Sequence, residues 1–204
     1  MKWLKKSYVA IVMAFLYAPI LVLIVFSFNQ SKSRGAWTGF TFGWYEKLFH
    51  NQMIIQSLMN TLLVAVISSV VATVLGTLAA IGIRNMKKMS RTLVMNVTYL
   101  PIINPEIVTG VSLMLLFVFV KSAGIRLDFG FTTVILAHIT FNVPYVILNV
   151  MPKLRQMDIS VFEAAQDLGC SPSQAFFKVV IPEIMPGIVA GFLMSFTYSL
   201  DDFI

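Results

Sequence analysis

Long apolar segments separated by short polar ones dominate the pattern of this chain. Apolar runs cover residues 8–28, 61–83, 93–120 and 129–150, and a fifth begins at Ile184. A helix needs roughly 20 apolar residues to cross the hydrocarbon core of a bilayer, because lipid offers no hydrogen-bond partner to a free backbone amide. The pattern therefore predicts an all-α membrane protein with five transmembrane helices.

The fifth apolar run ends without a polar flank, two residues after Asp202. A spanning helix that stops there has no place for its terminal carboxylate. We therefore expect a C-terminally truncated chain. Residues 1–57 are predicted to form an N-terminal helix and an external loop. Residues 58–204 are predicted to form the core transmembrane domain, with a polar segment at 151–183.

Composition and charge fix the environment and the orientation. With 58% hydrophobic and 12% charged residues, the chain lies outside the range of soluble domains. A cytoplasmic N-terminus places most of the 15 Lys and Arg residues in the cytoplasm, including the cluster at 84–91, as the positive-inside rule requires. The net charge of +6 therefore reports topology, and we expect the lipid bilayer and no nucleic acid as a partner. Two histidines without a carboxylate cluster predict no metal site.

Two further patterns concern packing and the external loop. Small residues recur every four positions at Ala72, Gly76 and Ala80, and again at Gly187, Gly191 and Ser195. Such rows let membrane helices approach closely, so we expect a tight bundle. In the loop at 29–57, Trp37, Trp44 and Tyr45 are interpreted as a belt at the head-group level, with a short amphipathic helix at 44–49 as the alternative.

Prolines and acids interrupt the apolar spans. Pro101 and Pro105 remove two backbone donors, so the third span is predicted to kink or break there. Ionisable groups inside a span are costly and are functional candidates by default. We assign Glu106, Asp201 and Asp202 to a cation pathway. His138 either joins these acids or is hydrogen-bonded inside the bundle, and the second interpretation is favoured.

The polar segment between the fourth and fifth spans is predicted to be a cytoplasmic elbow. Ser160 and Glu163 form a capping-box pattern that starts a short helix near Val161, and Gly169 suits the left-handed residue that ends it. A second start signal follows, a serine cap with proline and glutamine at the first and third helical positions: Ser171, Pro172, Gln174. Pro182 then precedes the return to the membrane.

The elbow carries a spaced pattern of Glu-Ala-Ala, three residues, Gly, and a Pro thirteen residues after the Gly, at Glu163, Ala164, Ala165, Gly169 and Pro182. In this pattern it resembles the EAA loop of binding-protein-dependent ABC transporter permeases, whose motif is Glu-Ala-Ala, three residues, Gly, nine residues, Ile-x-Leu-Pro. Val179 and Ile181 conservatively replace the family's Ile and Leu. The resemblance implies a type I ABC importer permease fold in which the elbow is the coupling helix that docks on a cytoplasmic ATP-binding subunit. The chain itself has no G-x-x-x-x-G-K-[ST] loop, so we expect no enzyme activity and no cofactor, ATP being bound by the partner. The residues assigned to ATPase coupling are Glu163, Ala164, Ala165, Asp167, Gly169 and Pro182.

The chain also resembles one subfamily, the second permease subunit of spermidine/putrescine importers, through "FTFGWYEKLF", "NPEIVTGVSLMLLF", "HITFNVPYVI" and "SFTYSLDDF". This resemblance implies a multi-pass protein of the bacterial inner membrane that forms half of a polyamine pathway. It also implies six spans, so we expect that a sixth helix is missing here. It further implies a paralogous permease subunit and an extracytoplasmic polyamine-binding protein as partners. Asp202 is expected either to bind substrate or to gate.

Other functions are weighed against this interpretation. An ABC permease for another small solute carries the same elbow. A proton-coupled secondary transporter would use Glu106 and a broken helix but leaves the elbow unexplained. A membrane-embedded enzyme lacks a catalytic cluster, and a scaffold has no need of buried acids.

Overall fold

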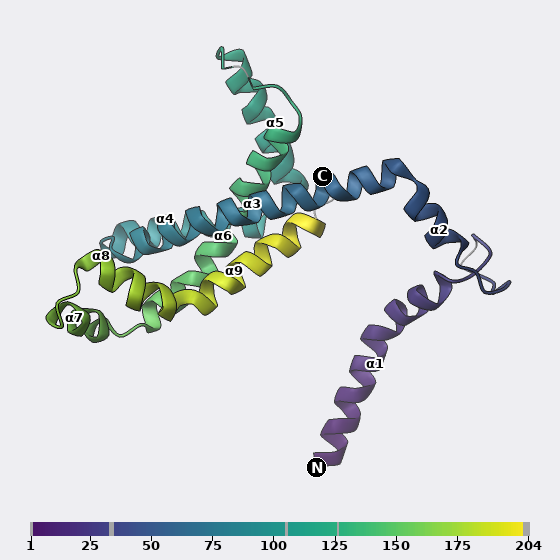
Figure 1. Ribbon diagram of the computed structural model, residues 1–204, viewed down its shortest axis with the longest axis horizontal. Coiled ribbons are helices and arrows are strands. Elements are labelled where there is room, and N and C mark those ends of the chain that lie inside the picture. The colour runs from purple at the N-terminus through teal and green to yellow at the C-terminus, as the bar shows by residue number, and fades with distance from the viewer. Residues whose placement is uncertain (1, 33–34, 105, 126, 202–204) are drawn as a thin grey trace. The chain divides into compact units, whose positions relative to one another are not determined.

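The computed structural model describes residues 2–32, 35–104, 106–125 and 127–201 and is helical almost throughout. Pairing of β type within these residues is limited to one isolated bridge between Asn29 and Phe40. The all-α prediction is therefore confirmed. The elements are α1 (Lys2–Phe26), α2 (Gly43–His50), α3 (Gln52–Arg84), α4 (Lys88–Ile103), α5 (Glu106–Ser122), α6 (Phe131–Gln156), α7 (Ile159–Asp167), α8 (Pro172–Ala175), the π-helical turn η1 (Phe176–Val180) and α9 (Ile181–Asp201) (Figure 1).

The chain divides into two compact units, residues 1–59 and 60–204, which are described separately. In the first unit, a polar and aromatic turn joins α1 to α2. The Asn29 side chain is buried and accepts a 2.9 Å hydrogen bond from the Thr38 amide, while Trp44 Nε1 donates to the Asn29 carbonyl at 2.8 Å. Phe28 stacks on Phe40 with ring centroids 5.3 Å apart. The short helix considered at 44–49 is present as α2.

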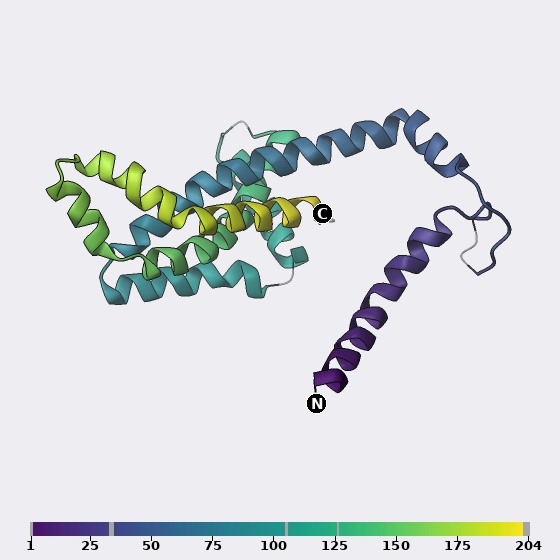
Figure 2. The same ribbon diagram turned by 60° about the horizontal axis from the view of Figure 1, so that its bottom comes forward.

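In the second unit, α6 is the helix on which α3, α4 and α9 pack (Figure 2). Val146 of α6 is fully buried between two glycines. A Cβ added at Gly76 of α3 would lie 2.6 Å from Val146 Cβ, and one added at Gly191 of α9 would lie 3.1 Å from Val146 Cα. Close approach of both backbones to α6 explains the two rows of small residues, and the predicted tight bundling is confirmed.

The third predicted span is two helices. The expected start at residue 93 is wrong, since α4 already begins at Lys88. Pro101 lies inside α4, which ends at Ile103, and α5 begins at Glu106. The axes of α4 and α5 meet at 109°, a geometry that gives either one broken span or a re-entrant pair. Pro105 lies outside the described residues.

Four described helical segments are long and apolar enough to cross a bilayer, or up to five if α4 and α5 count as one bent span. This agrees with the five predicted helices. Two predicted boundaries are wrong: α3 begins at Gln52, well before residue 61, and the last segment is continuous from Pro172 to Asp201. Pro182 and Pro186 therefore lie inside this helical segment, and Pro182 comes two residues after the π-helical turn η1.

Candidate functional site

The elbow between α6 and α9 is a folded segment built from α7 and α8. Its first helix begins two residues earlier than predicted, because Asp158 and not Ser160 is the N-cap. The Asp158 carboxylate accepts a 3.0 Å hydrogen bond from the Ser160 amide. That bond holds the pKa of Asp158 below its ordinary value, since it favours the ionised form. Asp158 was missed because Ser160 followed by Glu163 also matches a capping box.

The turn that follows α7 has the predicted chemistry. Gly169 has φ of +91°, a conformation that side chains other than glycine rarely adopt. Ser171 Oγ accepts from the Gln174 amide at 3.3 Å, and Gln174 Oε1 accepts from the Ser171 amide at 3.1 Å. This reciprocal pair is the capping box expected for the second helix. The conformation of the turn is thus fixed by Gly169 and by the capping box of Ser171 and Gln174.

The outer face of the elbow is solvent-exposed and mixed in character. Phe162 and Phe176 anchor it by packing against the core around Leu154 and Ile184. Glu163, Ala164 and Asp167 are exposed, as are two large apolar side chains, Leu168 at 88% and Phe177 at 68%. Apolar side chains this exposed on an ordered elbow are typical of a surface that another protein covers. Ala165 is half-buried and Pro182 is exposed at the start of α9.

A cavity of about 240 Å³ lies among α5, α6 and α9 and is the second candidate site. Glu106, the first residue of α5, lines it together with Pro101, Thr109, Thr133 and His138. Among the described residues no Lys or Arg side chain lines the cavity. One carboxylate in an otherwise uncharged, largely apolar wall favours a cation over an anion.

One of the predicted pathway acids lies away from the cavity. Asp201 is exposed at the end of α9 and does not line the cavity, and Asp202 lies outside the described residues. The structure instead brings Tyr145 of α6 and Tyr198 of α9 into the wall beside Glu106. Their rings stack with centroids 4.2 Å apart and an interplanar angle of 22°. Neither tyrosine stands out in the sequence, although both lie in stretches that carry the family resemblance.

His138 belongs to a polar contact across three helices. Its Nδ1 lies 2.7 Å from Ser199 Oγ of α9, which lies 3.1 Å from Ser68 Oγ of α3. All three side chains are buried. The prediction that His138 is hydrogen-bonded inside the bundle is confirmed. The contact joins the three helices that pack around Val146.

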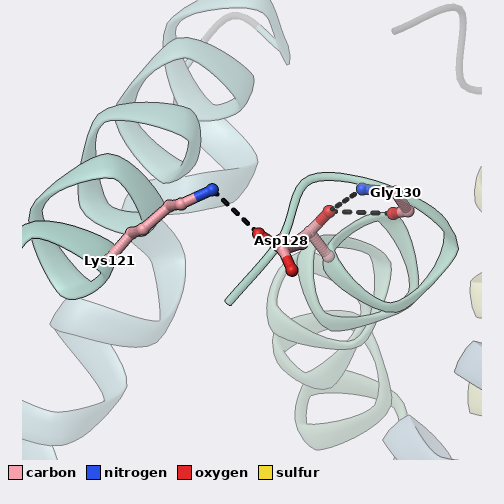
Figure 3. A network of polar contacts seen from close by, with 4 residues as sticks. Lys121, Asp128 and Gly130 are labelled. Carbon is pink, nitrogen blue, oxygen red and sulfur yellow. Dashed lines mark hydrogen bonds and ion pairs between the residues drawn. The ribbon is translucent and has the colours of Figure 1, made fainter. Parts of the chain in front are cut away.

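The turn between α5 and α6 is closed by polar contacts (Figure 3). Lys121 of α5 points at Asp128 and forms a 2.8 Å ion pair with it. The ion pair lowers the pKa of the Asp128 carboxyl, chiefly through the hydrogen bond that Lys121 donates. Thr133 Oγ1 accepts from the Gly130 amide at 3.0 Å and donates to the Gly130 carbonyl at 2.8 Å. Phe129 of this loop lines the cavity.

Among the described residues, apolar helices of membrane-spanning length surround a cavity lined by one carboxylate. This arrangement is typical of an integral membrane transport component. The family model for the binding-protein-dependent transport system inner membrane component matches residues 72–204. The chain belongs to this family.

Curated relatives cover almost the whole chain. The spermidine/putrescine transport system permease protein PotC of Haemophilus influenzae is 37% identical over 98% of this chain and 76% of its own length. The putrescine transport system permease protein PotI of Escherichia coli K12 is 39% identical, over 93% and 68% respectively. A PotC homologue of Mycoplasma pneumoniae is 30% identical, over 99% and 73%.

The fold is also found in a solved structure. The crystal structure of a bacterial ABC transporter involved in the import of the acidic polysaccharide alginate matches with a TM-score of 0.71 and 18% identity. The match covers 98% of this chain and 74% of that chain. An ABC importer permease fold is therefore confirmed.

Family membership settles the class of function. The protein is a membrane permease component of an ABC importer and is not an enzyme, since ATP is hydrolysed by a separate subunit. Its partners as a class are an ATPase, a paired permease and a substrate-binding protein. The secondary-transporter alternative is thereby excluded. The family's members are inner-membrane proteins.

Proposed function

We propose that this permease forms half of a pathway for polyamines such as spermidine and putrescine. The observation that carries the proposal is the cavity in which Glu106 is the one carboxylate and no described Lys or Arg is present. A polyamine alternates ammonium groups with methylenes, and an apolar wall bearing one carboxylate suits both parts. The substrates named for PotC and PotI support the same substrate class.

The pathway is proposed to include Asp201 and Asp202 besides Glu106. Asp201 is exposed one turn beyond Tyr198, so a cation leaving the cavity along α9 meets it next. Asp202 is assigned to the same end of the pathway, either as a ligand or as a gate. The break between α4 and α5, to which Pro101 and Pro105 are assigned, places Glu106 at the start of a new helix.

The elbow is proposed to couple this pathway to the ATPase. Glu163, Ala164, Ala165, Asp167, Gly169 and Pro182 are assigned to the coupling surface, which the exposed Leu168 and Phe177 extend. The N-terminus and the elbow lie in the cytoplasm in this proposal, and the loop that carries α2 faces outward. The paired permease is a paralogue, and the binding protein is one that delivers polyamines from outside.

Uptake in a reconstituted system tests the substrate. The permease, its paralogue, the ATPase and the binding protein are placed in proteoliposomes, and entry of radiolabelled putrescine and spermidine is measured. Glu106→Gln and Asp201→Asn together should lower uptake at least tenfold while ATPase docking is kept. Asp128→Asn, which removes a carboxylate outside the cavity, is the matched control and should transport normally. Normal uptake by the double variant would remove these acids from the pathway.

Co-purification tests the elbow. Glu163→Lys and Gly169→Asp should release the ATPase, the first by reversing a surface charge and the second by forcing a side chain into a positive-φ turn. Glu46→Lys makes the same charge reversal on the exposed face of α2 and should leave the ATPase bound. Retention of the ATPase by both elbow variants would refute the assignment.

A further inference from the structure

We propose that the stacked pair of Tyr145 and Tyr198 is a cation–π platform that holds an alkylammonium group of the substrate against Glu106. The choice of ligand rests on the proposed function. The inference deepens that function by assigning two aromatic side chains, Tyr145 and Tyr198, to substrate binding beside the acids. Both tyrosines line the cavity that Glu106 enters. They come from two different helices, so the platform exists only while α6 and α9 are packed together.

The geometry of the pair leaves ring faces available. With centroids 4.2 Å apart and planes at 22°, each ring covers one face of the other and keeps one face for other contacts. Both side chains are half-buried and both contribute to the cavity lining. A cation within about 6 Å of a ring centroid is attracted by the negative π face, and more strongly where water is excluded. An ammonium group seated against the pair can therefore contact the outer face of one ring.

Glu106 supplies the opposite charge at the same place. Glu106 and Tyr145 line the same cavity. A carboxylate and an aromatic face are complementary ligands for an ammonium group, because the carboxylate accepts its N–H donors while the ring contacts its methylene neighbours. His138 and Thr133 complete the polar lining without adding a fixed charge of either sign.

The size of the cavity selects a slim ligand. Its volume of about 240 Å³ lies below the range of about 300–1,000 Å³ that is usual for drug-sized molecules. It equals the liquid volume of roughly eight waters, at about 30 Å³ each. An aminoalkyl end fits within such a space.

A graded series of ring substitutions tests the platform. Tyr145→Phe and Tyr198→Phe keep the ring faces and should bind n-butylammonium within about twofold of the parent, measured by saturation-transfer NMR on the assembled transporter in nanodiscs. Replacing each of these phenylalanines by mono-, di- and trifluorophenylalanine keeps the shape and withdraws π density. Binding should then weaken stepwise, to about tenfold in the trifluoro variants. Tyr145→Leu and Tyr198→Leu should weaken n-butylammonium binding at least as much as the trifluoro variants do.

Two controls separate cation–π binding from shape. The neutral probe 1-pentanol has nearly the same size and should bind all the fluorinated variants alike. Fluorination at Phe196, which stacks on Phe192 of the same helix and does not line the cavity, should change nothing. Equal responses of the two probes, or failure of n-butylammonium to bind the parent, would overturn the platform. Failure of putrescine uptake with the graded binding intact would instead refute only the proposed function.

Discussion

Gly76 is the position at which one added methyl group should do most damage to the bundle. A Cβ on Gly76 would lie 2.6 Å from Val146 Cβ, 2.8 Å from Val146 Cγ1 and 3.1 Å from the Val143 carbonyl oxygen. Carbon atoms pack best at about 3.5–4.0 Å, so something must move. Val146 has no room to retreat, because it is fully buried and Gly191 packs closely against it. Gly76→Ala must therefore push α3 away from α6.

The loss of unfolding free energy in Gly76→Ala is the difference between two opposing effects. Overpacking a dense interior costs about 1–3 kcal/mol, and contacts this short with backbone and a β-branched side chain place Gly76→Ala near the upper end. Replacing glycine by alanine inside a helix returns about 1 kcal/mol. The net loss of about 2 kcal/mol should lower the melting temperature by about 4–8 °C for a chain of this length.

Gly82, on the same helix, is the matched control. Nothing lies within 4 Å of a Cβ added there, so Gly82→Ala keeps only the helical gain and should raise the melting temperature by about 2–4 °C. Both variants are compared with the parent by thermal unfolding of the purified transporter in nanodiscs. Equal stability of Gly76→Ala and Gly82→Ala would show that α3 and α6 do not approach as closely as described.

Three further outcomes are expected from polar contacts. The pKa of Asp158 is lower in the folded protein than its ordinary value of 3.8, so the ionised cap stabilises α7 at any pH above 3.8. This stabilisation is lost as the pH falls through the lower folded pKa. Hydrogen-exchange protection of α7 should therefore drop in acid. Asp158→Asn should remove that pH dependence and keep the cap, and an unchanged acid response would refute the assignment. Ser199→Ala removes contacts to two helices and Ser68→Ala only one, so the first should cost about 1 kcal/mol more in unfolding free energy. Lys121→Ala breaks an exposed ion pair and should leave uptake and the melting temperature unchanged within error; a clear loss would give the loop an unassigned role.

Much of the helical architecture could be predicted because it depends on local chemistry. Span length follows from bilayer thickness, and the rows ending at Ala80 and Ser195 follow from the need for close helix approach. The Ser171 box and the Gly169 turn are equally local, since each is specified by residues within a few positions. These features did not depend on knowing which helices are neighbours.

What could not be predicted depends on three-dimensional neighbours. Prolines indicated a break in the third span, but neither its 109° angle nor the start of α4 at Lys88 follows from the sequence. Tyrosines are common in membrane helices, so Tyr145 and Tyr198 became notable only when α6 and α9 brought their rings together. Ser160 and Asp158 are both competent caps, and only the backbone path selects Asp158.

The continuity of the last helical segment links the elbow mechanically to the cavity. From Pro172 to Asp201 the chain runs as one helical segment, with α8 at the elbow and Tyr198 at the cavity wall. Close contact at Gly187 and Gly191 prevents α9 from sliding past α6, because a displaced backbone would collide with α6 side chains. A push on the proposed coupling surface must therefore either tilt α6 and α9 together or be absorbed in η1. That turn is the π-helical part of the segment, and such turns are where helices bend. In the proposed mechanism, the packing of α6 and α9 that brings Tyr145 and Tyr198 together would also transmit movement of the ATPase to the cavity.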